Sequence, residues 1–174
     1  MAHLDQRGQK VHDAMTLANE GPVVIRYPKG AVRSVSAETV GSGLSANKMN
    51  TGDGRIAILA IGKMLGAAEK SVVALFDSGV SATLCDVRSC APLDPAMIRD
   101  AASHGAVLTA EDGIRDGGIG AGIESQVHAI SSAVPVESLG VPTQFIPHDK
   151  PDVILARFGL DADGIVAAAQ RLLS

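Results

Sequence analysis

The sequence is poor in aromatic residues: Phe, Trp and Tyr together make up 2% of its 174 residues, and tryptophan is absent. It therefore offers no aromatic surface on which nucleic-acid bases could stack. It also lacks a basic patch, because its 15 Lys and Arg residues are scattered along a chain of net charge −4. These two shortages argue against a nucleic-acid partner.

Long hydrophobic runs are missing as well. No stretch approaches the roughly 20 consecutive apolar residues that span a bilayer. Residues 1–10 are polar, unlike the apolar core of a secretory signal. We therefore expect a cytoplasmic protein with no membrane partner.

Cysteine is scarce: the sequence has two, Cys85 and Cys90. Their spacing fits neither a Cys-x-x-Cys redox pair nor a four-ligand zinc pattern, and thiols of cytosolic proteins stay reduced. The histidines are at positions 3, 12, 104, 128 and 148. None lies four residues from another, as two metal-binding histidines on one helix face would. The sequence predicts two free thiols and no metal site.

From residue 55 onward, apolar runs alternate with amphipathic segments. Residues 56–61 are all apolar, which is typical of a strand buried on both faces of a parallel sheet. Asp94 is predicted to cap a helix that has Pro95 at its first position. The predicted strands are 56–61, 80–87, 106–110 and 134–139, and the predicted helices are 65–76, 94–103, 119–131 and 162–173. This alternation predicts an α/β fold, a three-layer α/β/α sandwich with a mostly parallel sheet.

The part of the chain before residue 55 is less regular. Residues 4–18 carry an irregular helical stripe of apolar side chains. Residues 22–28 read as a short β-branched strand with proline at each end. Residues 29–55 are rich in Gly, Ser, Thr and Asn, so they predict a surface linker after which the domain proper begins.

The triplet Gly52-Asp53-Gly54 has the form that opens a thiamine diphosphate and magnesium motif. That motif places its Asp at the end of a strand, with an Asn-containing metal-binding loop downstream. Here the triplet precedes the strand that starts at Ile56. We therefore interpret it as a turn.

A glycine-rich stretch, residues 117–122, follows the predicted strand 106–110. It departs from a dinucleotide fingerprint, because the loop before it is too long and the acidic Glu137 falls inside a strand. A helix N-terminus with free amides is a possible anion site. The candidate residues of such an anion site or edge loop are Glu111, Gly118, Gly120 and His148. Close packing of the helix against the sheet is the favoured use of the glycines, and a solvated loop is the favoured setting of the Glu111-Asp112 pair.

Catalytic motifs are missing. The sequence has no Gly-x-Ser-x-Gly elbow, no phosphate-binding loop with Gly-Lys-Ser or Gly-Lys-Thr, and no convincing Ser-His-Asp set. The residues thus predict an α/β domain with no catalytic residues of its own.

Several segments, taken in order, resemble one family, the 1-deoxy-D-xylulose-5-phosphate synthases, which are thiamine diphosphate-dependent enzymes of the transketolase type. These segments are residues 21–30, 56–62, 86–94, 108–112, 117–120, 139–148 and 158–161. The first resembles the end of the family's pyrimidine-binding middle domain, and the second resembles the first strand of its C-terminal domain. Each motif is weak alone, but their common order is specific.

The resemblance implies a division of the chain: residues 1–30 as a remnant of the pyrimidine-binding domain, 31–54 as a linker, and 55–174 as a transketolase C-terminal-like domain. It implies a homodimer in which the other domains of the same enzyme bind thiamine diphosphate and Mg²⁺, with neither bound by this fragment alone. The substrates it implies are pyruvate and glyceraldehyde 3-phosphate, in a step toward isoprenoids (terpenoids) and thiamine. Lys29 is the one site residue carried over, as a contact to the substrate phosphate, where the family more often has Arg.

Two other interpretations stay open. Within the enzyme class, the chain could be the equivalent C-terminal domain of a transketolase or of a 2-oxoacid dehydrogenase beta subunit. From another class, it could be a stand-alone α/β binding or assembly module that uses the sheet edge near Glu111 and Gly118.

Overall fold

The computed structural model describes residues 11–13, 15–16, 21–26 and 43–174, and the last of these ranges holds the folded domain. Its strands are β1 (Asn47–Asn50), β2 (Ile56–Ala60), β3 (Thr83–Asp86), β4 (Ala106–Ile114) and β5 (Val136–Val141). Its helices are the 3-10 helix η2 (Gly62–Met64), α2 (Leu65–Asp77), α3 (Pro95–Ala101), α4 (Ile119–Ile130), α5 (Pro151–Arg157) and α6 (Ala162–Leu173). None of the helices in this described part is long and apolar enough to cross a membrane.

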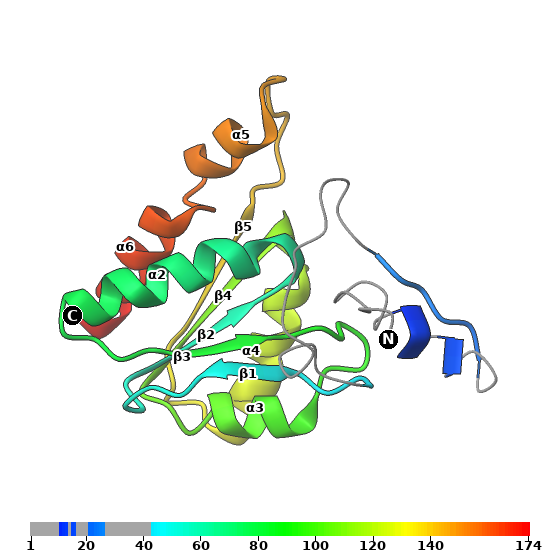
Figure 1. Cartoon of the computed structure of the whole chain (residues 1–174), viewed down its shortest axis with the longest axis horizontal. Coiled ribbons are helices and arrows are strands. Elements are labelled where there is room, and N and C mark those ends of the chain that lie inside the picture. Colours follow the sequence, from blue (N-terminus) through cyan, green and yellow to red (C-terminus); the bar gives the residue numbers. More distant parts are fainter. Residues whose placement is uncertain (1–10, 14, 17–20, 27–42) are drawn as a thin grey trace, which may run out of the picture.

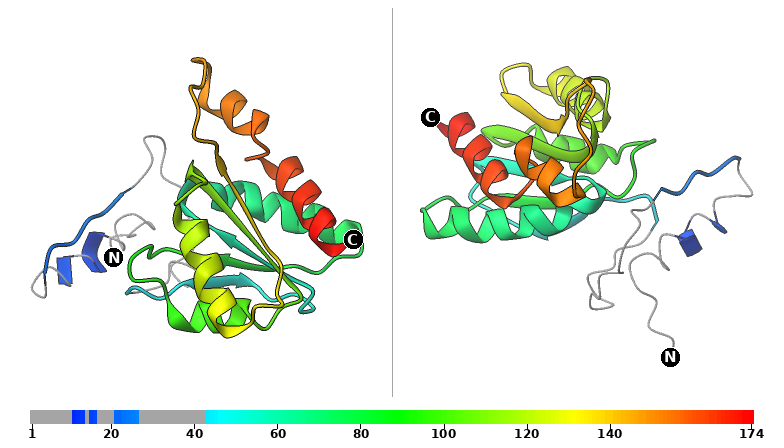
Figure 2. Two further views of the ribbon diagram at one scale, coloured as in Figure 1. Left: turned by 180° about the vertical axis from the view of Figure 1, so that it is seen from behind. Right: turned by 90° about the horizontal axis from the view of Figure 1, so that it is seen from above.

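The strands form one sheet in the order β1-β3-β2-β4-β5. Strand β2 runs parallel to both of its neighbours, β3 and β4, and β5 runs parallel to β4. Strand β1 alone is antiparallel, at the edge beside β3. Helices α2 and α6 lie side by side on one face of the sheet, and α3 and α4 cover the other (Figures 1 and 2). The predicted three-layer α/β/α sandwich with a mostly parallel sheet is confirmed.

Strand β2 contributes side chains to both hydrophobic cores of the domain. All five of its residues are buried, as the unbroken apolar run predicts. Ile56 and Ile58 belong to the core beneath α2 and α6, whereas Leu59 belongs to the core beneath α3 and α4. Because side chains alternate along a strand, one apolar run feeds both layers.

Two helices begin at aspartate caps, α3 at Asp94 and α6 at Asp161. The side chain of Asp94 accepts a hydrogen bond from the amide of Ala96 at 2.8 Å, and Pro95 follows it at the first helical position, as predicted. The other carboxylate oxygen of Asp94 accepts from the amide of Ala46 at 2.9 Å, which ties the chain before β1 to α3. Burial alone would raise the pKa of Asp94, but its hydrogen bonds from backbone amides hold that pKa below the ordinary value.

Besides the short 3-10 helix η2, two elements were not predicted. Residues 47–50 lie in the predicted linker, yet they form β1, because the free edge of β3 offers antiparallel backbone partners such as Cys85 for Lys48. Helix α5 lies between the last predicted strand and helix. It has only seven residues, too few for a helical period to stand out in the sequence.

The segment before the domain differs from its prediction. Residues 22–26, predicted as part of a strand, form no strand in the structure, and the side chain of Val24 is 92% exposed. Pro22 has no N–H for a ladder, which is consistent with this outcome. Of the predicted helix 4–18, the residues that the structure describes, 11–13 and 15–16, are helical.

A buried polar chain joins three separate parts of the domain. Thr83 Oγ1, at the start of β3, accepts from the amide of Gly52 at 2.9 Å and lies 2.9 Å from His104 Nε2. His104 Nδ1 lies 2.8 Å from the carbonyl of Asp100, so Nδ1 must carry the proton. In neutral His104, Nε2 therefore accepts from the Thr83 hydroxyl. Every polar group in this series of hydrogen bonds then has a partner.

We expect Thr83→Val to lower the free energy of unfolding by about 2–4 kcal/mol, because it leaves the partly buried Gly52 amide and the buried His104 Nε2 without partners. Thr83→Ser keeps the hydroxyl and loses one methyl group, which costs about 1 kcal/mol. Urea denaturation of both variants measures the difference. If the valine variant were as stable as the serine variant, the polar chain would not stabilise the fold.

Candidate functional site

The order in which strands are added to the sheet reverses between the neighbouring strands β2 and β4. After β2 the chain passes to α2 on one face, and after β4 it passes to α4 on the opposite face (Figure 2). In open α/β sheets, ligands bind at the carboxyl ends of strands beside such a switch point. The loops that follow β2, β3, β4 and β5 at this edge therefore form the candidate site.

The side chain of Glu111, a residue of β4, lies at the N-terminus of α4. This side chain, 5% exposed, accepts hydrogen bonds from the amide of Gly120 at 2.9 Å and from that of Ile119 at 3.2 Å. A helix N-terminus attracts negative charge, because its first amides are unpaired and its dipole is positive there. The structure thus brings Glu111, Gly118 and Gly120 together, with a carboxylate of the protein itself in the place of an external anion.

This arrangement corrects one expectation. The favoured setting for Glu111 was a solvated loop, but the side chain is buried beneath the glycine-rich stretch. Asp112, the next residue along the chain, is exposed. The two carboxylates therefore face different surroundings, because side chains alternate along β4.

The glycines permit the close approach of α4 to the sheet. A Cβ atom on Gly120 would lie 2.5 Å from Thr109 Oγ1 and 2.7 Å from Ser138 Oγ. A Cβ atom on Gly118 would overlap the Glu111 carboxylate and the carbonyl of Ile114. Close packing of helix against sheet, the favoured interpretation of this stretch, is confirmed.

Arg88, two residues after the end of β3, was not among the residues singled out from the sequence. Its backbone φ is 58°, a left-handed conformation that is uncommon outside glycine. Its side chain is 2% exposed; Nη1 donates to the carbonyl of Ser45 at 2.9 Å, and Nη2 lies 3.4 Å from Asp13 Oδ2. This buried cation therefore ties residues 13 and 45 to the carboxyl edge. The one signal in the sequence is a basic residue that directly follows an apolar strand.

The remaining candidate residues are not part of this cluster. His148 is exposed, in the loop between β5 and α5. Lys29 lies outside the residues that the structure describes, so its predicted phosphate contact stays a prediction.

The triplet at residues 52–54 serves the fold. A Cβ atom on Gly52 would overlap the backbone at residues 81–83, and the Asp53 amide donates to the carbonyl of Ser81 at 2.9 Å. The Arg55 guanidinium, hydrogen-bonded to Asp53, lowers the pKa of that carboxyl to about 2. With its glycine against the backbone and its carboxylate paired to Arg55, the triplet does not fit thiamine diphosphate and Mg²⁺.

Within residues 11–13, 15–16, 21–26 and 43–174, no group of three or more His, Cys, Asp or Glu side chains could hold a metal ion.

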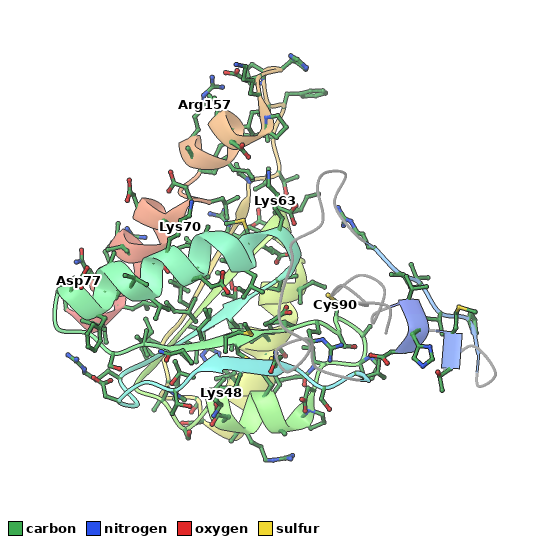
Figure 3. The ribbon with its side chains drawn as sticks, in the orientation of Figure 1. Lys48, Lys63, Lys70, Asp77, Cys90 and Arg157 are labelled. Carbon is green, nitrogen blue, oxygen red and sulfur yellow. The ribbon has the colours of Figure 1, made fainter. Side chains whose placement is uncertain are left out.

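Both cysteines are reduced thiols outside any disulfide, as predicted. Burial raises the pKa of the Cys85 thiol to about 12, and the neighbouring Asp86 carboxylate raises it further. Cys85 therefore stays protonated and inert at neutral pH. Cys90 is exposed in the loop after β3 (Figure 3).

Comparison with known families assigns the domain. The family model for the transketolase C-terminal domain matches residues 45–165. The chain therefore belongs to the transketolase C-terminal domain family. The match begins ahead of β1, in agreement with the place of this strand in the sheet.

Several curated relatives are named 1-deoxy-D-xylulose-5-phosphate synthase. The protein from Leptothrix cholodnii is 36% identical over 170 residues, which cover 88% of this chain and 25% of the relative. That from Alcanivorax borkumensis is 37% identical over 150 residues, 84% of this chain and 22% of the relative. The chain thus spans about a quarter of the length of these relatives.

A solved structure has the same fold. It is named "Split gene transketolase, inactive beta4 tetramer" and superposes with a TM-score of 0.73 at 28% sequence identity. The similarity covers 83% of this chain and 47% of that one.

We expect Glu111→Ala to lower the free energy of unfolding by about 2–4 kcal/mol, because two amides at the helix N-terminus lose a charged acceptor. Glu111→Gln keeps one carbonyl oxygen and should lose less. Inorganic phosphate should raise the Tm of the alanine variant, whose vacated helix N-terminus can bind it, more than that of the wild-type protein. Equal stabilisation of both proteins by phosphate would mean that Glu111 does not fill an anion site.

Proposed function

We propose that this chain is the C-terminal domain of a 1-deoxy-D-xylulose-5-phosphate synthase. The observation that carries the proposal is the identity of 33–37% with curated synthases across 84–88% of the chain. The enzyme is a cytoplasmic transferase that joins pyruvate to glyceraldehyde 3-phosphate with release of carbon dioxide. Its product supplies isoprenoid and thiamine biosynthesis.

In this proposal, thiamine diphosphate and Mg²⁺ are held by the other domains of the enzyme, and the cofactor supplies the carbanion chemistry when bound. The chain contributes no catalytic residue. Its carboxyl edge, with α4 anchored by Glu111 and residues 13 and 45 tied by Arg88, faces those domains. The equivalent domain of a transketolase is the weaker alternative, because the similar solved structure is 28% identical.

The proposal includes self-association, as a homodimer. Residues 1–30 would belong to the pyrimidine-binding domain that precedes this one, with the linker ending ahead of β1 rather than at residue 54. The similar solved structure is named as a tetramer of beta chains, which supports contacts between copies of this type of domain.

Lys29 is proposed to contact the phosphate of glyceraldehyde 3-phosphate. Pro28 before it stiffens the backbone, and Gly30 after it permits a sharp turn. An ammonium is a point charge, so the contact is less directional than the fork of an arginine.

Kinetics of the intact enzyme test this role. A hydrogen bond to a charged group contributes roughly 1.5–3 kcal/mol, or about a ten- to hundredfold change in affinity. Lys29→Ala should raise the KM for glyceraldehyde 3-phosphate by about that factor and leave the KM for pyruvate nearly unchanged, whereas Lys29→Arg should preserve both. Unchanged kinetics for both substrates in Lys29→Ala would make Lys29 an ordinary surface lysine.

A further inference from the structure

Large apolar side chains are exposed along the carboxyl edge of the sheet. Ile114, the last residue of β4, lies opposite Val141, the last residue of β5, and is 55% exposed. Leu44 is 42% exposed and comes three residues before β1, whose first residue pairs with the last residue of β3. Phe145 comes four residues after β5 and is 104% exposed. Apolar surface is therefore exposed at this edge beside both outer strands of the sheet, β1 and β5.

Phe145 is the most exposed of these side chains. It belongs to residues 142–150, which run outward from the end of β5 to the start of α5 (Figures 1 and 2). The start of α5 lies at the same edge, because Asp152 forms an ion pair at 2.8 Å with Lys63 of η2, which follows β2. Aromatic side chains are enriched in protein interfaces, and exposed apolar surface of this kind marks an interaction site.

The chain that precedes the domain is held at this edge as well. Arg88 Nη1 donates to the carbonyl of Ser45 at 2.9 Å, and Nη2 lies 3.4 Å from Asp13 Oδ2. The exposed fraction is 2% for the Arg88 side chain and 13% for that of Asp13, so their contact is largely shielded from water. Asp13 is one of residues 1–30, which the proposed function assigns to the pyrimidine-binding domain. That domain therefore approaches this one from the carboxyl edge.

The width of the sheet limits what can cover the exposed apolar side chains. The outer strands β1 and β5 are four strand spacings apart, about 19 Å. Leu44 lies beside one of them and Phe145 follows the other. A small-molecule ligand is too short to contact both, whereas a folded domain covers such a distance. The relatives, four times as long as this chain, have room for further domains.

We propose that Phe145 is the aromatic anchor by which this domain docks onto the pyrimidine-binding domain of the same enzyme. Ile114 and Leu44 extend the contact along the carboxyl edge. This inference rests on the proposed function and adds a positioning residue to it. A phenylalanine side chain has no acid, base or nucleophile to offer the reaction, so Phe145 acts by holding the domain in place.

Hydrogen exchange of the backbone amides of residues 143–146 tests the proposal. In the chain alone these amides should exchange fast, because the segment is exposed. In the intact enzyme, docking should slow their exchange by about 100-fold or more. Phe145→Ser should speed it again by about 30-fold, the loss expected of one interface anchor. Phe145→Leu keeps an apolar side chain and should preserve most of the protection.

Phe76→Ser is the matched control. Phe76 is also exposed, at 69%, but it lies beside Asp77 at the end of α2 remote from Lys63 and the carboxyl edge (Figure 3). Its loss should leave the exchange of residues 143–146 unchanged. Because no described residue covers Phe145, Phe145→Ser should also leave the Tm of the chain alone unchanged. An effect in the intact enzyme then cannot come from a misfolded domain.

Four results would overturn the proposal. They are equal exchange of residues 143–146 in the chain alone and in the intact enzyme, protection that survives Phe145→Ser, equal loss of protection in Phe76→Ser, and protection in the chain alone that grows with its concentration. The last would assign Phe145 to a second copy of the chain. Exchange is measured without substrate, so an intact enzyme with no synthase activity would refute the proposed function while the exchange still decides the role of Phe145.

Discussion

Burial of strand β2 on both faces is the constraint from which the rest of the domain follows. Its residues alternate between two apolar cores, so neither face of the sheet can be left to water. Helices must therefore cover both faces, and the chain must leave β2 toward one layer and β4 toward the other. That divergence opens the carboxyl edge between these two strands, which is where an α/β domain meets its ligands and partners.

Glu111 determines what this edge can do. A helix N-terminus at a switch point would normally be available to an external anion. Here the amides of Ile119 and Gly120 are already bonded to the Glu111 carboxylate, and the glycines bring α4 onto the sheet. The N-terminus of α4 at this edge is thus satisfied from within the chain. Such an edge suits contact with other domains, which agrees with a role that supports catalysis carried out elsewhere.

Much of the fold could be predicted, because each layer has a local signal in the sequence. The run at 56–61 indicated the central strand, Asp94 with Pro95 marked the start of α3, and the spacing of strands and helices indicated the parallel sheet. The features that could not be predicted from the sequence depend on contacts between residues distant in the chain. Strand β1 is polar and exists only through its pairing with β3; the burial of Glu111 depends on amides eight and nine residues further on; nothing local reveals the positive φ of Arg88. The full exposure of Phe145 likewise has no local signal in the sequence.

We propose above that this chain performs the part of a synthase C-terminal domain. The most direct measurement is the activity of a chimaera in which this chain replaces the matching segment of the Leptothrix cholodnii enzyme, which is 36% identical to it. We expect the chimaera to form 1-deoxy-D-xylulose 5-phosphate from pyruvate and glyceraldehyde 3-phosphate, and the same enzyme truncated before that segment to form none. A folded chimaera that binds thiamine diphosphate but is as inactive as the truncated enzyme would contradict it.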